Sequence, residues 1–282
     1  MAADLTGPSP GPSSTDAAVP ATPPAPAPAG SASHSPHRLR FGLIYGALGT
    51  ILVVAIVGLT VFATRSINPA PKWSTWHPKG GGLGAAHEIA DHVSQRYHLP
   101  NGDQLVDVIA QAPSVSPSTG TVPIHFVAVK GTKGTGTHNQ LYPVSSANSV
   151  MYTLCGLGPS CEIATGKPSV QRGLLVRREI LELALYTFKY VGGIDNVLAF
   201  MPGTAGKTAK YIVYLRHSDV ADELKQPLTT TLGENVPKLK TIPAGEVRTI
   251  DTTTTHRVYS FTVAQAPQGD LLFVLAPFRP GP

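Results

Sequence analysis

Hydrophobic residues follow three different patterns along the chain, and these patterns divide it into a tail, an apolar helix and a folded domain. Residues 1–36 are rich in Pro, Ala and Ser and contain no Ile, Phe, Trp or Tyr. Such a segment cannot bury enough apolar surface to offset the entropy lost when it becomes ordered. We therefore expect a disordered tail over residues 1–40.

Residues 41–64 contain no charged side chain. As a helix they would span about 36 Å, which exceeds the roughly 30 Å hydrocarbon core of a bilayer. The pattern predicts one transmembrane helix. A cleaved signal peptide is the alternative, because residues 61–63 would serve as a small-residue cleavage site. Gly42 and Gly46, spaced four apart, offer a face through which two such helices could form a homodimer.

The orientation of this helix follows from its flanks. Arg38 and Arg40 precede it, while Arg65, Lys72 and Lys79 follow, so the count of basic residues decides nothing. The denser basic cluster lies before the helix, and both cysteines lie after it, which favours a cytosolic N-terminus. We expect a single-pass protein of the cell membrane, with the lipid bilayer as a partner and an extracytoplasmic C-terminal domain.

Residues 65–82 are predicted to form a linker rich in Pro and Gly. It contains Trp73 and Trp76, the two tryptophans of the chain. They could rest on lipid headgroups as an interfacial anchor, or they could pack on the domain that follows. The sequence leaves both interpretations open.

Residues 83–282 mix helical and strand periodicities and predict an α+β domain with a mainly antiparallel sheet. The strongest helical pattern covers 170–191, where Ser169 can cap the start and Gly192 can end the helix, so we expect this helix at the centre of the core. Further helices are predicted at 83–98 and 218–226, and strands at 105–111, 122–130, 149–155, 196–201, 209–216, 257–263 and 271–276.

Cys155 and Cys161 enclose a short loop that contains Gly156, Gly158 and Pro159. Outside the cytoplasm such a pair is expected to form a disulfide. The spacing differs from the C-x-x-C of disulfide-exchange enzymes, although a redox pair, a catalytic cysteine or free thiols are alternatives. Two cysteines also exclude an all-cysteine zinc or iron–sulfur site.

The segments 154–158 (LCGLG) and 174–190, together with the Pro/Ala-rich tail and apolar helix, resemble a family of uncharacterised single-pass membrane proteins of actinobacteria. The resemblance covers the apolar helix and most of the domain. It implies no activity, and no functional residue is carried over from it.

Two short motifs resemble known sites but lack the residues that the chemistry needs. Residues 203–208 (GTAGKT) look like a phosphate-binding loop, but Met201 replaces the first glycine of that pattern and a strand is expected next. Residues 87–92 (HEIADH) look like a zinc-protease helix, but Asp91 occupies the second histidine position. A hairpin loop and a solvated helix face are the favoured interpretations.

Charged residues on the apolar helix at 170–191 favour structural ion pairs. Arg178 and Glu182 are four apart and can pair, which would contribute about a few tenths of a kcal/mol if the pair is exposed. Arg177 falls within the apolar stripe and either reaches water or needs a buried carboxylate. Glu179 and Glu182 could instead be a carboxylate pair for glycoside hydrolysis.

Charged residues make up 14% of the chain and the net charge is +5, with the basic residues of the domain scattered. This distribution suits weak attraction to anionic lipid or wall polymer and argues against nucleic acid. No catalytic residue, cofactor or metal site is predicted. The Gly-, Thr- and Ser-rich stretch 130–147 is a candidate binding loop, since long loops in compact domains are usually functional or disordered. Its candidate binding residues are Lys130, Lys133, His138 and Asn139.

We therefore expect a membrane-anchored extracytoplasmic module of the cell envelope that works by binding or assembly. Its partner would be an envelope protein or a wall polymer. The alternative is a membrane-anchored envelope hydrolase. A pocket in which titratable groups with perturbed pKa values converge would favour the hydrolase, and a loop-lined or apolar surface would favour binding.

Overall fold

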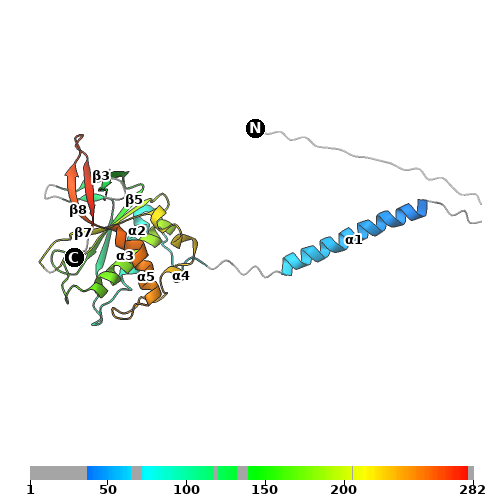
Figure 1. Ribbon diagram of the computed structural model, residues 1–282, viewed down its shortest axis with the longest axis horizontal. Helices are drawn as coiled ribbons and strands as arrows, with labels where there is room; N and C mark the ends of the chain where they lie inside the picture. The colour runs from blue at the N-terminus through cyan, green and yellow to red at the C-terminus, as the bar shows by residue number, and fades with distance from the viewer. Residues whose placement is uncertain (1–36, 65–71, 117–119, 132–138, 205, 279–282) are drawn as a thin grey trace, which may run out of the picture. The chain divides into compact units, whose positions relative to one another are not determined.

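The computed structural model describes residues 37–64, 72–116, 120–131, 139–204 and 206–278. The chain divides into two units, Met1–Asn68 and Pro69–Pro282 (Figure 1). The first unit contains the helix α1 (His37–Thr64), whose side chains are described at residues 45–60. The tail predicted over residues 1–40 lies outside the described residues up to residue 36.

Within the described part of the chain, no helix is both long and apolar enough to cross a membrane. The predicted transmembrane helix at residues 41–64 was therefore wrong.

The second unit combines helices with a nine-stranded sheet. Its helices are α2 (Gly82–Ser94), α3 (Val170–Tyr190), α4 (Leu228–Thr231) and α5 (Ala244–Thr254), with 3₁₀ turns at His217–Val220, Glu223–Lys225 and Thr255–Arg257. Its strands are β1 (Asp107–Gln111), β2 (Ser114–Val115), β3 (Val122–Val129), β4 (Gln140–Pro143), β5 (Ser149–Cys155), β6 (Asn196–Phe200), β7 (Tyr211–Arg216), β8 (Val258–Gln265) and β9 (Leu271–Pro277).

The sheet curls until its two edges nearly meet. The strand order is β1-β5-β6-β7-β8-β9-β3-β2, with β4 also paired to β3. The first and last strands of this order, β1 and β2, are consecutive in sequence and separated by Ala112 and Pro113 alone. The three steps of chain from Gln111 to Ser114 span at most about 11 Å, so the edges must lie close together. The result is a nearly closed, barrel-like sheet.

The sheet is mixed, because β5 pairs with β6 and β3 pairs with β9 in parallel. The predicted α+β fold was wrong, because the sheet is mixed and nearly closed into a barrel, although six of its eight described strand pairings are antiparallel, as predicted. The physical reason is that the alternation of side chains identifies a strand but not the direction of its neighbour. The first parallel pair needs a crossover connection, which α3 provides between β5 and β6.

The two faces of the sheet carry separate hydrophobic clusters. In β6, Val197 and Ala199 face the helices, whereas Leu198 points to the inside of the barrel. The inner cluster also contains Phe273 and Tyr259. Because side chains alternate along each strand, every strand at the centre of the sheet serves both clusters.

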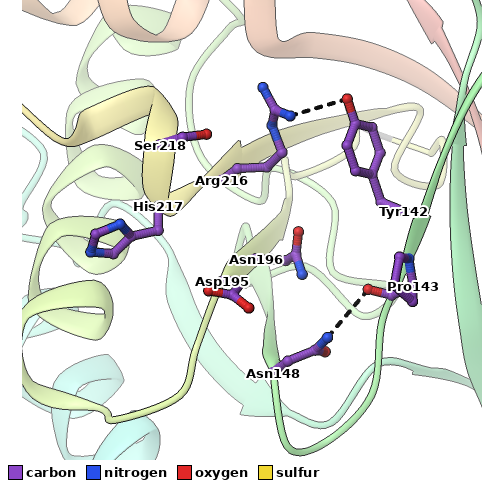
Figure 2. A pocket seen from close by; sticks show the side chains of 8 residues that line it. All are labelled: Tyr142, Pro143, Asn148, Asp195, Asn196, Arg216, His217 and Ser218. Carbon is purple, nitrogen blue, oxygen red and sulfur yellow. Dashed lines mark hydrogen bonds between the residues drawn. The ribbon is translucent and has the colours of Figure 1, made fainter.

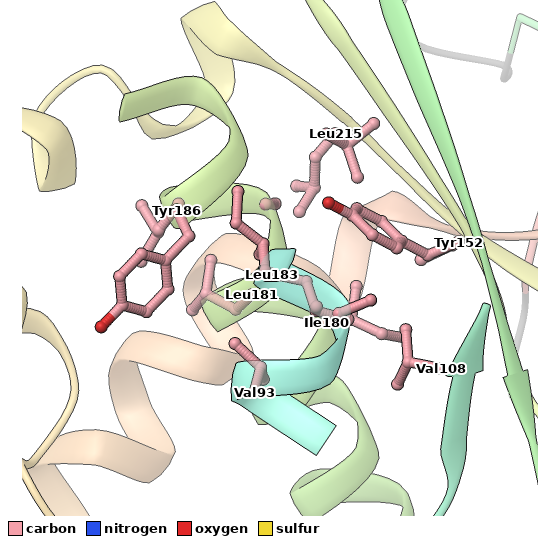
Figure 3. Packing of buried hydrophobic residues seen from close by; sticks show 14 of the residues in the cluster. Val93, Val108, Tyr152, Ile180, Leu181, Leu183, Tyr186 and Leu215 are labelled. Carbon is pink, nitrogen blue, oxygen red and sulfur yellow. The ribbon is translucent and has the colours of Figure 1, made fainter. Parts of the chain in front are cut away.

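The helix α3 is the centre of the outer cluster, as predicted. The Ser169 side chain accepts a hydrogen bond from the backbone N–H of Arg172 at 3.1 Å and caps its start. Leu181 and Leu185 are fully buried. Figure 3 shows side chains of this helix packed with Val93 of α2 and Tyr152 of β5. Figure 1 shows α2, α3 and α5 gathered on one side of the sheet.

Several local elements differ from the sequence-based expectation. The predicted helix at 218–226 consists of two 3₁₀ turns. The predicted binding loop contains the strand β4. The helix α5 was not predicted, because its Thr-rich sequence has weak helix propensity. Cys155 and Cys161 form a disulfide, as predicted, with their Cα atoms 4.1 Å apart.

Candidate functional site

A polar pocket opens at the barrel where β5 and β6 begin and β7 ends. We name it the barrel-mouth pocket (Figure 2). Its volume is about 390 Å³. Its lining residues are Tyr142, Pro143, Asn148, Asp195, Asn196, Arg216, His217 and Ser218. The mouths of β-barrels are frequent ligand sites because strand ends bring polar side chains together around a rigid opening.

The register of three strands determines which residues meet at this pocket. Ser149 at the start of β5 lies beside Asn196 at the start of β6. Arg216 at the end of the antiparallel strand β7 lies opposite Asn196. Three segments that are distant in the sequence therefore contribute side chains to one opening.

The two asparagines are held in place by hydrogen bonds from neighbouring groups. Asn196, which is 5% exposed, accepts a hydrogen bond from the Tyr214 hydroxyl at 2.7 Å and donates to the Ser149 Oγ at 3.3 Å. The Asn148 Oδ1 accepts from the backbone N–H of Ser145 at 2.8 Å. Burial raises the pKa of Tyr214, so its hydroxyl keeps the proton that it donates. The side-chain amides are therefore oriented before any ligand arrives.

Arg216 is the central cation of the pocket. Its guanidinium pairs with Asp219 at 3.0 Å and donates to the Tyr142 hydroxyl at 3.1 Å, while its carbon Cζ lies 4.9 Å from the centre of the Tyr142 ring. The hydrogen bond to Asp219 raises the pKa of Arg216, although burial opposes the rise. Asp219 also binds Arg257 at 2.7 Å. One buried carboxylate therefore balances two guanidinium groups.

Asp195, His217 and Ser218 line the same pocket and include the residue types of a hydrolytic triad. Within the described residues their side chains make no hydrogen bond to one another; the contact between Asp195 and His217 is a backbone hydrogen bond of 2.9 Å. The His217 ring packs edge-on against Phe188, and Figure 2 shows it directed away from the Ser218 hydroxyl. The geometry does not place a base beside the serine, as nucleophilic catalysis requires.

The carboxylate pair predicted from the sequence lies elsewhere, inside the helical layer. Glu182 accepts hydrogen bonds from Arg96 at 2.5 Å, Tyr97 at 2.6 Å and Arg178 at 3.0 Å. The predicted pairing of Arg178 with Glu182 is therefore confirmed, and the pair is buried rather than exposed. Arg178 also pairs with Glu246 of α5 at 2.6 Å. These contacts form a buried ion network that joins α2, α3 and α5.

The other two charged residues of this helix that the sequence singled out are Glu179 and Arg177. Burial raises the pKa of Glu179, whose carboxyl oxygens have no hydrogen-bond partner within the described residues. Its fully buried position does not suit a glycosidase carboxylate. Arg177 pairs with Asp251 at 2.7 Å, so it is a partly buried cation with a carboxylate partner.

Of the four candidate binding residues, Lys130 and Asn139 do not line the barrel-mouth pocket. Lys133 and His138 lie outside the described residues. Lys130 follows β3 and Asn139 precedes β4. In the strand order, four strands separate β3 from β5, the strand that ends at Cys155. The part of the predicted loop 130–147 that reaches the pocket is β4, which contributes Tyr142 and Pro143.

Neither resembling motif forms its site. The segment 203–208 leads into the strand β7 rather than a helix, so it lacks the helix N-terminus of a phosphate-binding loop. His87 and Asp91 lie on the exposed face of α2. A polar run that could have drawn attention to the pocket is 216–219 (RHSD), which directly ends an apolar strand.

Comparisons with protein-family models, with curated proteins and with solved structures find no match to this chain. The resemblance to the actinobacterial family therefore rests on the segments 154–158 and 174–190 and the layout of the chain, and the functional interpretation rests on the pocket itself.

Proposed function

We propose that the domain is an extracytoplasmic binding module that holds a neutral, hydroxyl-rich ligand, a saccharide unit of a wall polymer, in the barrel-mouth pocket. The observation that carries the proposal is the set of unused hydrogen-bonding groups that converge there. The disulfide supports an oxidising compartment, where such bonds persist.

The unused groups can be counted from the hydrogen bonds already made. A guanidinium has about five N–H donors. Arg216 uses its Nε, Nη1 and Nη2 atoms once each, which leaves further N–H donors. Within the described residues, the side-chain amides of Asn148 and Asn196 each donate one hydrogen bond, to Pro143 and Ser149, and each keeps a second N–H donor. These planar donors, with the Asp195 carboxylate as an acceptor, suit the adjacent hydroxyl groups of a sugar ring.

The charges of the pocket favour a neutral ligand. Arg216 and Arg257 share Asp219, which leaves one positive charge, and Asp195 supplies one negative charge at the opening. The Asp195 carboxylate would repel a polyanion, and this repulsion would offset the attraction of the remaining positive charge. The cavity of about 390 Å³ is at the lower end of the roughly 300–1,000 Å³ typical of ligand pockets, which suits one or two sugar rings.

The proposal differs from the hydrolase alternative in the groups that it needs. The clearly shifted groups at the pocket are Arg216 and Tyr214, and both pKa values are raised above ranges already far from neutral. Neither shift creates an acid or a base that exchanges protons near pH 7. Binding requires only the fixed donors and acceptors that the strand ends supply.

The test is calorimetric titration of the protein with a panel of soluble mono- and disaccharides, together with co-sedimentation with insoluble wall polysaccharide. We expect saturable binding to at least one sugar. Arg216→Lys keeps the charge but removes the planar donor fork, and Ser218→Ala removes one hydroxyl. Each should weaken binding about fivefold to tenfold, because one hydrogen bond contributes about 1 kcal/mol.

Arg248→Lys is the matched control, since Arg248 is exposed on α5 away from the pocket. It should bind like the wild type. Absence of binding to every sugar and to the polymer would refute the proposal. Release of reducing sugar ends from the polymer would establish the hydrolase instead.

A further inference from the structure

Residues 73–80, within the predicted linker, lie against the helical layer as a docked segment that we name the strap. At one end, the backbone N–H of Leu228 donates to the Trp73 carbonyl at 2.7 Å. At the other end, the Glu88 carboxylate accepts hydrogen bonds from the backbone N–H groups of Lys79 at 2.7 Å and Gly80 at 3.0 Å. The strap is therefore fixed at both ends by hydrogen bonds to the domain.

Between these ends the strap is held by aromatic contacts. The Trp73 ring meets Tyr186 and Tyr190 edge-on, with ring centres 5.6 Å apart in each case. The Ser74 hydroxyl lies 2.5 Å from the Tyr190 hydroxyl. Of the two interpretations of the tryptophans, packing on the domain describes the structure. Each aromatic pair contributes about 0.5–1.5 kcal/mol beyond its buried area.

Trp76 covers His92 of α2. The two rings are nearly parallel, with an interplanar angle of 3° and centres 3.9 Å apart. Trp76 also meets Tyr186 edge-on at 5.4 Å. Within the described residues, the His92 ring makes no hydrogen bond that would favour its protonated form in the docked state.

Titratable groups surround His92 on every side: the strap itself carries His77, whose ring lies near Tyr190, and the segment before α5 adds Glu234, which lines the same pocket as His92. On its own helix, Arg96 and Glu88 are its neighbours one turn away in either direction. From α3, Glu182 and Tyr186 face it. Burial lowers the pKa of His92, Arg96 lowers it further, and Glu182 opposes both. Burial raises the pKa of Tyr186 to about 12, so this neighbour stays neutral.

We propose that the strap is an acid-released latch, which docks while His92 is neutral and detaches when His92 takes up a proton. The sign follows from the lowered pKa. When the strap is detached, His92 is exposed and titrates near its ordinary value of 6.5. Below that pH the detached state binds a proton more readily than the docked state, so falling pH favours detachment.

Detachment opens a second cavity, which we name the strap pocket. Its volume is about 260 Å³. Ser74 and Thr75 of the strap form one wall, and Arg96 and Glu182 lie among the residues opposite. Release of the strap would remove that wall and expose the paired charges. The latch is independent of the saccharide proposal, because it shares no lining residue with the barrel-mouth pocket.

The test uses the tryptophans, since the chain contains two and both lie in the strap. Emission of the full-length protein should shift to longer wavelength between pH 7.5 and pH 5, with a midpoint below the ordinary histidine value of about 6.5. The Lys79 and Gly80 amides should lose protection from hydrogen exchange over the same range, after correction for intrinsic rates. Far-UV circular dichroism should remain unchanged, which excludes global unfolding.

His92→Gln should abolish the shift, and His87→Gln, an exposed histidine of the same helix, should preserve it. In Trp76→Phe, the remaining tryptophan should still report release. A histidine cation can also quench a tryptophan that stays docked. Quenching without loss of protection at Lys79 and Gly80 would overturn the proposal, as would a transition that survives in His92→Gln.

Discussion

The barrel-mouth pocket takes its walls mainly from the ends of strands, whereas the strap pocket takes one wall from a segment that lies outside every helix and strand. Arg216 and Asn196 are adjacent in a sheet register and cannot separate without breaking the ladder. Ser74 and Thr75 are held by the contacts of the strap alone. The first pocket is therefore permanent, and the second depends on a local docking equilibrium.

The two sites also differ in how far their charged side chains are exposed to solvent. At the barrel mouth, charged side chains reach solvent, and Arg216 is 31% exposed. Behind the strap pocket, the network around Arg178 is closed from solvent. An exposed charged side chain is available to bind a ligand. A buried charged side chain needs an oppositely charged partner inside the protein, because its desolvation is costly. The following predictions test this contrast, from the largest effect to the smallest.

Arg178→Ala should produce the largest loss of stability. It leaves the Glu182 and Glu246 carboxylates buried without their shared cation, and breaking such a pair costs about 3–5 kcal/mol. Urea denaturation measures the free energy of unfolding. Arg248→Ala, at an exposed position on α5, should change it by less than about 0.5 kcal/mol. A loss at Arg178 as small as that of the control would mean that the network is not closed from solvent.

Leu181→Ala should destabilise the protein by about 2–5 kcal/mol, because it opens a cavity in the fully buried outer cluster. Both pockets are built on α3 or on strands that it covers, so the whole domain should lose stability rather than one pocket alone. Val170→Ala, at the 84% exposed start of the same helix, is the control and should be nearly neutral. Equal effects at the two positions would show that the core has been misplaced.

Tyr142→Phe should cost less, about 0.5–1.5 kcal/mol, because it removes a hydroxyl that bonds Arg216 and Gln140 at the rim of the barrel mouth. Its ring remains to pack against Arg216 and Tyr214. Thermal or urea unfolding would measure the loss. A loss of more than about 3 kcal/mol in the free energy of unfolding would contradict this prediction. It would mean that the Tyr142 hydroxyl stabilises the fold as strongly as Arg178 does.

The smallest effect should be the dependence of stability on pH through His92. The pKa of His92 is lowered in the folded protein. Above about pH 6.5 the ring is neutral in both the folded and the unfolded chain, so it does not make stability depend on pH there. As pH falls from about 6.5 through the lowered pKa, the unfolded chain gains a proton first and stability decreases. Unfolding midpoints in urea between pH 7.5 and pH 5 should fall less in His92→Gln than in the wild type. Identical slopes would contradict the prediction.

Local patterns were sufficient for the elements that depend on neighbouring residues. The helix at 170–190 follows from its apolar period, its Ser169 cap and the glycines that end it. The closing hairpin of β8 and β9 follows from alternation around a Gly-containing turn. The disulfide follows from a short loop that keeps Cys155 and Cys161 together. Each of these signals lies within about twenty residues of sequence.

The sequence signals for other features, such as strand direction and the helix α5, were misleading or too weak for a correct prediction. The order strand, helix, strand at 149–200 is typical of a parallel pair, yet the abundance of hairpin-like alternation favoured an antiparallel sheet. The helix α5 has a Thr-rich sequence, and tertiary contacts such as Glu246 with Arg178 stabilise it. The ion pair of Arg178 and Glu182 follows from their spacing, but its burial does not, because α2 and α5 cover that face of α3 only in the folded domain.

The sequence by itself therefore determined most of the longer helices and strands, which cysteines pair and which helix lies at the core. The tertiary structure alone decided the barrel closure, the barrel-mouth pocket and the docking of the strap on His92. The reason is physical: helix and strand periods reflect contacts a few residues apart, whereas strand register and helix docking depend on the total packing of distant segments. Asn196 and Arg216 are unremarkable in sequence and become neighbours only because β6 and β7 pair in one register.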